Sequence, residues 1–396
     1  MKNKKLNYIP YGKHYITKNA LVHIKKVLNS KNITQGPTIE AFENKIARYV
    51  GSKYAVAVSS ATAGLHIACQ SLNFKKNSKL LTSTISFVSS SNVAYFLGGK
   101  ASFVDIDPNT VAMNLLDLES KIKKIKPNVV IPVHMGGTSY HHKEIKKLSN
   151  KYNFKIVEDA AHSFGGKYDE FNKIGCCKYS NLTVFSFHPV KTITTGEGGV
   201  ITTNDKKLYM QLLRLRSHGI NKKNDLPIIK KQAYSNSKLN QWYYEMRTLG
   251  YNYRMTDLQA SLGISQLSLL NKILKKKKLI FKTYDNAFSK VKNIIPLQVD
   301  KRSFTSFHLY IISINFKKLK KSRQKLMEIL ERNKIYCQVH YIPIVMHPFY
   351  KKKGFLIKNF PSSKNYYESC LSIPCYYSLK KSEQNFVIKI ILDFIK

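Results

Sequence analysis

The chain has 396 residues, 43% of them hydrophobic and 22% charged, which is the composition of an ordinary soluble globular protein. A chain of this length is expected to form two lobes, because single hydrophobic cores stop growing at roughly 250–300 residues. No apolar run reaches about 18 residues, which argues against a membrane span. The first ten residues lack the apolar stretch of a secretory signal, so a cytoplasmic protein is expected.

The formal net charge of +43 raises the question of nucleic-acid binding. Only eight of the 66 basic residues are arginines, and the lysines are distributed along the whole chain instead of forming a patch. The densest run, residues 275–278, falls in a helical pattern and is interpreted as its solvated face. The sequence therefore predicts no nucleic-acid partner, although the positive field would attract an anionic substrate such as a nucleotide diphosphate.

The six cysteines form no CxxC pair, and no second pair lies at the spacing of zinc ligands. Adjacent Cys176 and Cys177 are interpreted as buried small hydrophobic residues. Reduced thiols and no metal site are therefore expected.

Apolar runs alternate with helical patterns in the first half of the chain. Strands are predicted over residues 54–58, 80–82, 101–104, 129–133, 154–157, 182–187 and 199–203, and helices over residues 62–72, 88–96 and 144–152. Strands that alternate with helices predict an α/β fold, with a mostly parallel central sheet covered by helices on both faces. In such sheets ligands bind at the carboxyl ends of the strands.

The second half begins with a polar, irregular segment over residues 221–248, which contains the only tryptophan, Trp242. A long helix is predicted next, over residues 256–288. Further strands are predicted over residues 309–314 and 336–340, and further helices over residues 321–332 and 381–395. The expected division is a large domain over residues 1–255, followed by residues 256–396 with the long linking helix and a smaller C-terminal α/β domain.

Three segments place polar residues where parallel strands are predicted to end. The first, residues 59–64 (SSATAG), joins a strand to a helix through small and hydroxylated residues. Backbone N–H groups and the positive end of the helix dipole suit a phosphate there. A plain Ser/Thr helix cap is the alternative interpretation.

The second segment carries Asp159 at the end of an apolar strand, so its carboxylate would point into the crevice. There it could pair with the cationic nitrogen of a heterocycle, or it could cap the turn that follows. His162, three residues further on, is either a catalytic histidine or one that is simply packed or solvated.

The third segment carries Lys191, on a loop between two predicted strands. Partial desolvation would disfavour its charged form, and a neutral amine can form a Schiff base with a carbonyl group. A lysine that merely borders a β-turn is the alternative. An amine, an aspartate and an anion site on successive strand ends are together the three contacts that hold pyridoxal phosphate (PLP).

Longer motifs surround these segments. They are TQGP at residues 34–37, SSATAGLH at 59–66, FVDIDP at 103–108, VHMG at 133–136, EDAAH at 158–162, FSFHPVK at 185–191 and GEGG at 196–199. In these motifs the sequence resembles the fold type I PLP-dependent aminotransferases that act on nucleotide-linked sugars. The resemblance covers nearly the whole chain, from YGK at residues 11–13 to SIPC at residues 372–375. The resemblance implies the fold type I PLP-dependent transferase fold, with residues 1–255 as the PLP-binding domain and residues 1–35 contributing to the substrate site. It also implies a homodimer with shared active sites.

Four further motifs resemble one branch of this family, the transaminases of pseudaminic acid biosynthesis. They are RSHG at residues 216–219, WYYEM at 242–246, GYNYRMTD at 250–257 and QVHY at 338–341. The branch implies transfer of the amino group of L-glutamate to C4 of a UDP-linked 4-keto-6-deoxy-N-acetylhexosamine. The product would be UDP-4-amino-4,6-dideoxy-N-acetyl-altrosamine, for surface polysaccharide or flagellin glycosylation. Enzymes for other nucleotide-linked 4-keto sugars, such as the precursor of aminoarabinose, are the nearest alternative.

Two other functions occur on, or are compatible with, the same fold. In PLP-dependent sugar 3-dehydratases a histidine replaces the Schiff-base lysine, so Lys191 argues against that activity. A catalytically inactive regulator or basic binding protein would not need Lys191 and Asp159 together.

The resemblance also implies roles for single residues. Lys191 would form the Schiff base and move a proton at the substrate carbon, and Asp159 would keep the pyridine nitrogen protonated, so these two are the expected catalytic residues. Cofactor binding is expected from Ala61, Thr62, Phe87, Asp159, His162, Ser186, Lys191 and, across a dimer interface, Asn252. Substrate binding is expected from Tyr11, Lys31, Asn32, Ile33, Thr34, Ala61, Ser186, Asn252, Gln338, Val339, His340 and Tyr341. His188 and His347 are assigned either to the sugar or to packing.

Overall fold

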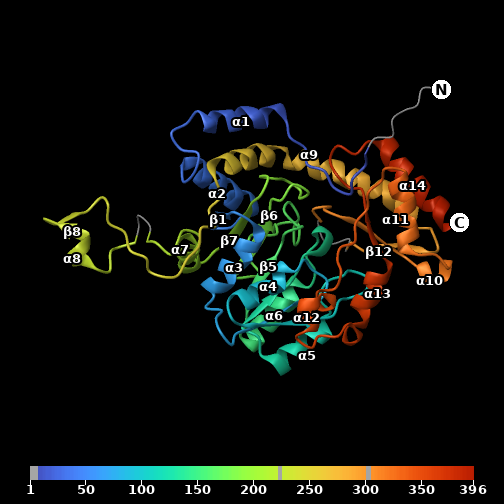
Figure 1. The fold of residues 1–396 in the computed structure, drawn as a ribbon, viewed down its shortest axis with the longest axis horizontal. Helices are drawn as coiled ribbons and strands as arrows, with labels where there is room; N and C mark the ends of the chain where they lie inside the picture. The colour runs from blue at the N-terminus through green and yellow to red at the C-terminus, as the bar shows by residue number, and fades with distance from the viewer. Residues whose placement is uncertain (1–7, 222–224, 300–304) are drawn as a thin grey trace.

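The computed structural model describes residues 8–221, 225–299 and 305–396 (Figure 1). Its centre is a seven-stranded sheet with the strand order β1-β7-β6-β5-β4-β2-β3. The strands are β1 (Tyr54–Val58), β2 (Lys79–Ser83), β3 (Lys100–Val104), β4 (Val129–Ile131), β5 (Lys155–Asp159), β6 (Leu182–Ser186) and β7 (Gly199–Thr203). All seven lie where the sequence predicts strands, within two residues at each end.

The sheet is mostly parallel, and β7 is its exception. It pairs antiparallel with both β6 and β1, whereas the pairs among β6, β5, β4, β2 and β3 are parallel. No helix lies between β6 and β7, so the chain turns directly back and the two strands run in opposite directions. Because β1 is antiparallel to β7, it is again parallel to β6. The carboxyl ends of β1, β2, β4, β5 and β6 therefore meet at one edge of the sheet.

Helices cover both faces of this sheet. The helices nearest to it are α2 (Pro37–Val50), α3 (Ala61–Ser71), α4 (Ser89–Phe96), α5 (Leu115–Ile125), α6 (His142–Tyr152) and α7 (Lys206–Leu215). Strand β1 shows why: Val56 and Val58 pack in the cluster under α3, α4 and α7, and Ala55 and Ala57 pack in the cluster under α2. Successive side chains of a strand point to opposite faces, so a strand that is apolar throughout needs two cover layers.

A 32-residue helix, α9 (Asp257–Phe288), connects this sheet to the C-terminal part of the chain. It begins with a capping box between Thr256 and Gln259. Its first half packs with α2 under the large sheet, through Leu270 and Ile273. Its second half packs against another core, through Tyr284 and Phe288. One helix therefore belongs to two hydrophobic clusters and holds them together.

The second core surrounds a three-stranded antiparallel sheet in the order β10-β11-β12. The strands are β10 (Ile294–Pro296), β11 (Tyr310–Ile314) and β12 (Cys370–Ile373), and the helices are α10 (Phe316–Leu319), α11 (Arg323–Arg332), α12 (Pro348–Lys351), α13 (Pro361–Ser369) and α14 (Lys381–Ile395). The expected strand over residues 336–340 is wrong. There Gln338 alone forms a bridge, with Ser372, because residues 338–342 turn to line a cavity instead of continuing the ladder.

The N-terminal helix α1 (Lys18–Leu28) lies along α9 at the top of Figure 1. At the left of that view an arm, residues 225–249, projects away from the sheet with α8 (Lys230–Ala233), β8 (Tyr234–Ser235) and β9 (Lys238–Leu239). No helix in the described ranges is long and apolar enough to cross a membrane.

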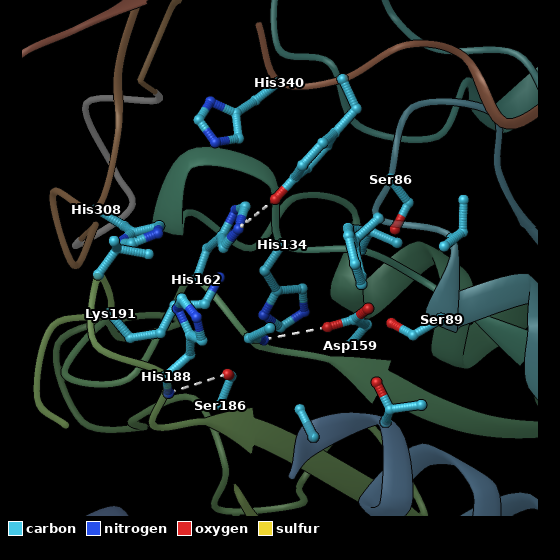
Figure 2. A pocket seen from close by; sticks show the side chains of 18 of the residues that line it. Ser86, Ser89, His134, Asp159, His162, Ser186, His188, Lys191, His308 and His340 are labelled. Atoms are coloured by element: carbon cyan, nitrogen blue, oxygen red, sulfur yellow. Dashed lines mark hydrogen bonds between the residues drawn. The ribbon is translucent and has the colours of Figure 1, made fainter. Parts of the chain in front are cut away.

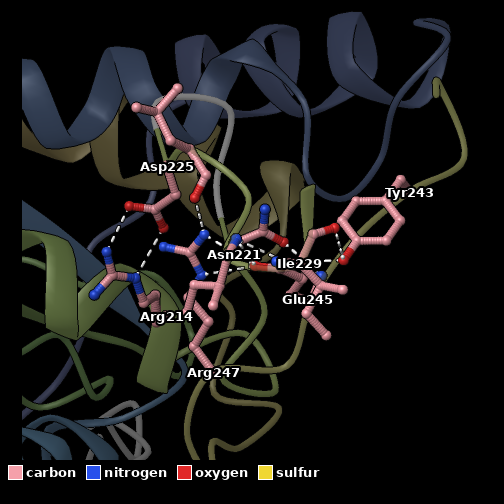
Figure 3. Close-up of polar contacts among 9 residues, drawn as sticks. Arg214, Asn221, Asp225, Ile229, Tyr243, Glu245 and Arg247 are labelled. Atoms are coloured by element: carbon pink, nitrogen blue, oxygen red, sulfur yellow. Dashed lines mark hydrogen bonds and ion pairs between the residues drawn. The ribbon is translucent and has the colours of Figure 1, made fainter. Parts of the chain in front are cut away.

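The arm is held by charged contacts at its root (Figure 3). The Glu245 carboxylate accepts hydrogen bonds from the backbone N–H groups of Ile228 and Ile229, at 2.8 and 2.7 Å, and pairs with Arg247 at 3.0 Å. Arg214 of α7 pairs with Asp225 at 2.5 Å. These contacts give the arm a defined shape although it has almost no apolar core of its own.

Candidate active site

A cavity of about 680 Å³ opens at the carboxyl edge of the large sheet. Its walls come from the segments that follow β1, β2, β4, β5 and β6, together with His308 and residues 338–342 from the C-terminal part of the chain. Figure 2 shows the side chains of Lys191 and Asp159 at this one cavity. A volume of this size accommodates a cofactor or a small-molecule substrate.

Asp159 is the last residue of β5, and its carboxylate is buried at the cavity wall. Oδ2 accepts a hydrogen bond from Ser90 Oγ at 2.5 Å, and Oδ1 accepts one from the backbone N–H of Ala161 at 3.2 Å. The capping contact considered from the sequence is therefore present, but it occupies one oxygen of a carboxylate that also lines the cavity. Ser90 was missed by sequence reasoning, although the run of serines at residues 89–91 opens α4 close to this strand end.

Lys191 lies on the loop between β6 and β7 and is half-buried. Its backbone N–H donates to the carbonyl of His188 at 2.9 Å, which closes a turn beside the cavity. The pKa of the Lys191 amine is lowered to about 8, mainly by burial; the negative charge of Asp159 opposes this shift, and the positive charge of Lys277 makes a smaller contribution in the same direction as burial. The amine is therefore far more often neutral at physiological pH than an ordinary lysine.

Three histidines and a tyrosine form the wall above Lys191. His162 Nε2 lies 3.0 Å from the Tyr341 hydroxyl, and its ring lies 4.5 Å from the ring of His308. Burial lowers the pKa of His162 and of His308 well below the usual range and that of His340 to about 3. These imidazoles are neutral at physiological pH, so they act as hydrogen-bonding groups and not as cations.

The phosphate segment predicted after β1 forms the N-terminus of α3. Ser60 caps the helix by accepting a hydrogen bond from the Ala63 N–H at 3.1 Å, so the capping interpretation is confirmed for Ser60. Ala61 and Thr62 line the cavity. Gly199 allows this arrangement, because a Cβ atom there would lie 2.8 Å from the Ala61 nitrogen. Strand β7 thus passes directly under the helix N-terminus.

The cavity brings together most of the residues predicted for the site. Those that line it are Tyr11, Ala61, Thr62, Phe87, Asp159, His162, Ser186, Lys191, Gln338, Val339, His340 and Tyr341. His188 and His347, for which the sequence left packing open, also line it. Phe87 is 57% exposed, so it is not a core residue at the end of β2.

Five predicted residues do not line this cavity. Lys31, Asn32, Ile33 and Thr34 lie at the start of α9, where Thr34 forms a bridge with Thr256 and the Asp257 carboxylate accepts the Gly36 N–H at 2.7 Å. Asn252 forms a bridge with Ser217. The binding roles of these five residues stay predictions.

The residues of the cavity fit PLP. They include one amine with a lowered pKa, one buried carboxylate and a helix N-terminus beside Thr62 and Ser186. His162 Nδ1 is buried and has no hydrogen-bond partner among the residues that the structure describes, so it is available to a bound group.

Sequence reasoning missed His308, which lies far along the chain from every motif and reaches the cavity only through the fold.

Comparison with known proteins agrees with this site. Residues 14–392 match the DegT/DnrJ/EryC1/StrS aminotransferase family. The chain is 34% identical over 381 residues to the UDP-4-amino-4,6-dideoxy-N-acetyl-beta-L-altrosamine transaminase of Campylobacter jejuni, covering 96% of this chain and 95% of that protein.

Two solved structures are similar over almost their whole length. Helicobacter pylori PseC, an aminotransferase involved in the biosynthesis of pseudoaminic acid, superposes with a TM-score of 0.87 at 28% identity and covers 98% of this chain and 99% of that one. The PLP-form of Spr1654 from Streptococcus pneumoniae superposes with a TM-score of 0.88 at 26% identity, with the same coverage. The chain therefore belongs to the DegT/DnrJ/EryC1/StrS family and is a PLP-dependent sugar aminotransferase of fold type I.

Proposed function

We propose that this enzyme transfers the amino group of L-glutamate to C4 of a UDP-linked 4-keto-6-deoxy-N-acetylhexosamine. The product is UDP-4-amino-4,6-dideoxy-N-acetyl-altrosamine, an intermediate of pseudaminic acid biosynthesis for surface polysaccharide or flagellin glycosylation, made in the cytoplasm. The observation that carries the proposal is the 34% identity to the C. jejuni altrosamine transaminase over nearly the full length of both proteins. The similarity to H. pylori PseC, an aminotransferase involved in the biosynthesis of pseudoaminic acid, also supports it.

When bound, PLP supplies an electron sink that stabilises negative charge on the substrate carbon during proton transfer. In the proposed mechanism, the neutral Nζ of Lys191 would accept the proton that leaves the substrate carbon and would donate it to the cofactor, and the reverse in the other half of the reaction. Its lowered pKa suits this task, because the amine accepts and releases a proton near physiological pH. Asp159 keeps a proton on the ring nitrogen of the cofactor by offering a buried negative charge.

The remaining residues of the cavity wall would hold and orient the cofactor and the sugar substrate. Thr62 and Ser186, with the N–H groups at the start of α3, would hold the phosphate of the cofactor. The ring of Phe87 would cover the cofactor face, and His162 would donate a hydrogen bond from Nδ1, because the Tyr341 hydroxyl fits the role of donor to its Nε2. Tyr11 and residues 338–341 form the part of the wall assigned to the sugar.

The substrate assignment is tested with a panel of keto sugar nucleotides. The purified enzyme is assayed with PLP and L-glutamate. Among the keto sugar nucleotides of the panel, the highest kcat/KM is expected for the UDP-linked 4-keto-6-deoxy-N-acetylhexosamine whose amination at C4 gives the altrosamine product. Products are followed by mass spectrometry and their C4 configuration by NMR. A dTDP-linked 4-keto sugar or the UDP-linked aminoarabinose precursor turned over at least tenfold better would replace the proposed substrate, and loss of water in place of amination would indicate a dehydratase.

We also propose that two copies of the chain share their active sites. Asn252 and residues 31–34 lie outside the cavity of their own copy, and the arm carries exposed apolar side chains such as Trp242, which is 73% exposed, and Leu249, which is 70% exposed. Exposed aromatic and aliphatic groups on a projecting element are typical of a surface that is covered in an assembly. The proposed assembly is a homodimer in which Asn252 reaches the cofactor phosphate of the neighbouring site.

Mixing two inactive variants tests the shared site. Lys191→Ala and Asn252→Ala are each expected to be inactive, but their co-expression should restore roughly a quarter of the wild-type specific activity. Random pairing makes half of the dimers hybrids, and each hybrid has one site with both residues intact. Recovery is measured with the amination assay on the co-expressed mixture, and hybrids isolated through two different affinity tags should reach roughly half of the wild-type specific activity. If hybrids form but stay inactive, Asn252 does not act across the interface.

A further inference from the structure

Lys277 is a buried lysine in a run of four. The run over residues 275–278 was interpreted as a solvated face, and for Lys277 that interpretation is wrong: its side chain is 3% exposed, whereas Lys278 is exposed. Its Nζ donates a hydrogen bond to the carbonyl of His308 at 3.1 Å. In the described part of the chain it forms no ion pair with a carboxylate. A buried ammonium without a counter-charge is unfavourable for folding, so such a group usually serves the site that it faces.

The place of Lys277 connects it to the active site. A narrow cavity of about 20 Å³ lies behind the loop between β6 and β7, and Lys191 and Lys277 both line it. The remaining wall contains no carboxylate; it includes Lys13, His14, Thr194, Gln266 and Cys375. The rigid helix α9 thus presents a cation to the rear of Lys191.

The charge of Lys277 acts on several groups of the site. It lowers the pKa of Lys191, of His162 and of His308. Burial has the largest effect in each case, and the effect of Lys277 is also smaller than that of Asp159 on Lys191 and than that of Lys191 on the two histidines. Burial lowers the pKa of Lys277 itself. The effects on three separate side chains have the same sign and come from one residue, so Lys277 is a common source of positive potential at the amine.

We propose that Lys277 is a positioning residue of this aminotransferase, a fixed buried cation that acts across the shared narrow cavity on Lys191 and keeps its amine in the unprotonated, nucleophilic form. The inference deepens the proposed role of Lys191 and rests on it. A second cation next to a reactive lysine is a known way to obtain a neutral amine, since a like charge disfavours protonation of its neighbour.

Other titratable groups also face Lys191, and each affects the protonation of its amine in a known direction. Asp159 at the end of β5 favours the protonated amine. His162 after β5, His308 before β11 and His340 of the 338–342 segment are neutral, because burial lowers their pKa. Lys13 and His14 of the N-terminal segment line the same narrow cavity. Asp159 and Lys277 on α9 are the charged groups that shift the pKa of Lys191 within the described ranges, in opposite directions.

The test measures Lys191 directly in the full-length chain freed of cofactor. The protein is pulse-labelled with a trace of acetic anhydride at pH values from about 6 to 11, a range that brackets the pKa of a lowered and of an ordinary lysine, and the acetylation of Lys191 is quantified by mass spectrometry. In the wild type the midpoint is expected near pH 8. Lys277→Met is expected to raise the midpoint by about half to one pH unit, because the like charge is removed. Lys277→Arg, which keeps the charge, should leave the midpoint near that of the wild type.

Controls separate an electrostatic role from a structural one. Lys278→Met removes an exposed lysine one residue further along α9 and should not move the midpoint. Circular dichroism confirms that each variant is folded, and Lys277→Gln replaces Lys277→Met if the latter is not. A midpoint that stays within about 0.2 pH units of the wild type in the neutral variant overturns the proposal, whatever happens to the stability. Because no sugar is used, failure of the substrate assignment leaves this readout unaffected.

Discussion

Lys191→Ala is expected to lower amination by at least about four powers of ten, which is the loss found when a nucleophile that works as part of a unit is removed. The other lysines near this loop in the described residues, Lys13 and Lys277, line the narrow cavity behind it and not the active-site cavity. The buried imidazoles of His162, His308 and His340 are held neutral. Single-turnover amination with L-glutamate and the keto sugar nucleotide measures the loss. The visible absorption of the bound cofactor, which depends on its bond to the lysine, should also change.

Two comparisons make this result specific. Lys278→Ala removes a lysine that is exposed on α9 and should retain wild-type turnover. Lys191→Arg keeps a positive charge but is never neutral at physiological pH, so it should be as inactive as the alanine variant. If Lys191→Ala retained turnover within tenfold of the wild type, the assignment of Lys191 as the nucleophile would be wrong.

Asp159→Asn is expected to lower kcat by about three powers of ten, equivalent to about 4 kcal/mol of barrier at 1.4 kcal/mol for each factor of ten. The amide has nearly the same shape: its oxygen can accept the hydrogen bond from the Ala161 N–H, and its nitrogen can donate to Ser90 Oγ, so the fold should persist. It lacks the negative charge that keeps a proton on the ring nitrogen of the cofactor. Pre-steady-state amination kinetics measure the effect, because the loss should lie in the proton-transfer step.

Ser90→Ala provides the matched comparison for Asp159. It removes the 2.5 Å hydrogen bond to Asp159 Oδ2 but leaves the carboxylate in place. A loss of about tenfold is expected, since one hydrogen bond to a charged group contributes about 1.5–3 kcal/mol and part of it is replaced by water. If Asp159→Asn lost no more than Ser90→Ala, the charge of Asp159 would not be what the reaction uses.

Much of the molecule could be predicted from local sequence. All seven strands of the large sheet were located, because each is a short apolar run bounded by polar or glycine-rich turns. The positions of Asp159 at a strand end and of Lys191 on the loop after β6 follow from the same pattern. These features depend on neighbours in the chain, and the carboxyl edge of a parallel sheet then brings them together.

The expected strand over residues 336–340 shows where local pattern fails. Its residues have strand-like character, but the structure places residues 338–341 at the cavity, with the Tyr341 hydroxyl 3.0 Å from His162, a residue 179 positions away. That contact is available only after β12 and the large sheet are both in place. Tertiary contact therefore overrode the local preference.

The sequence by itself determined the fold class, the elements of the large sheet, the family and the lysine and aspartate of the site. Only the tertiary structure decided that Ser90 supports Asp159, that His308 joins the wall, and that one lysine of the run at residues 275–278 is buried. The reason is physical. Periodicity encodes which residues share a face of a helix or strand, but which segment that face meets depends on packing between elements far apart in the chain.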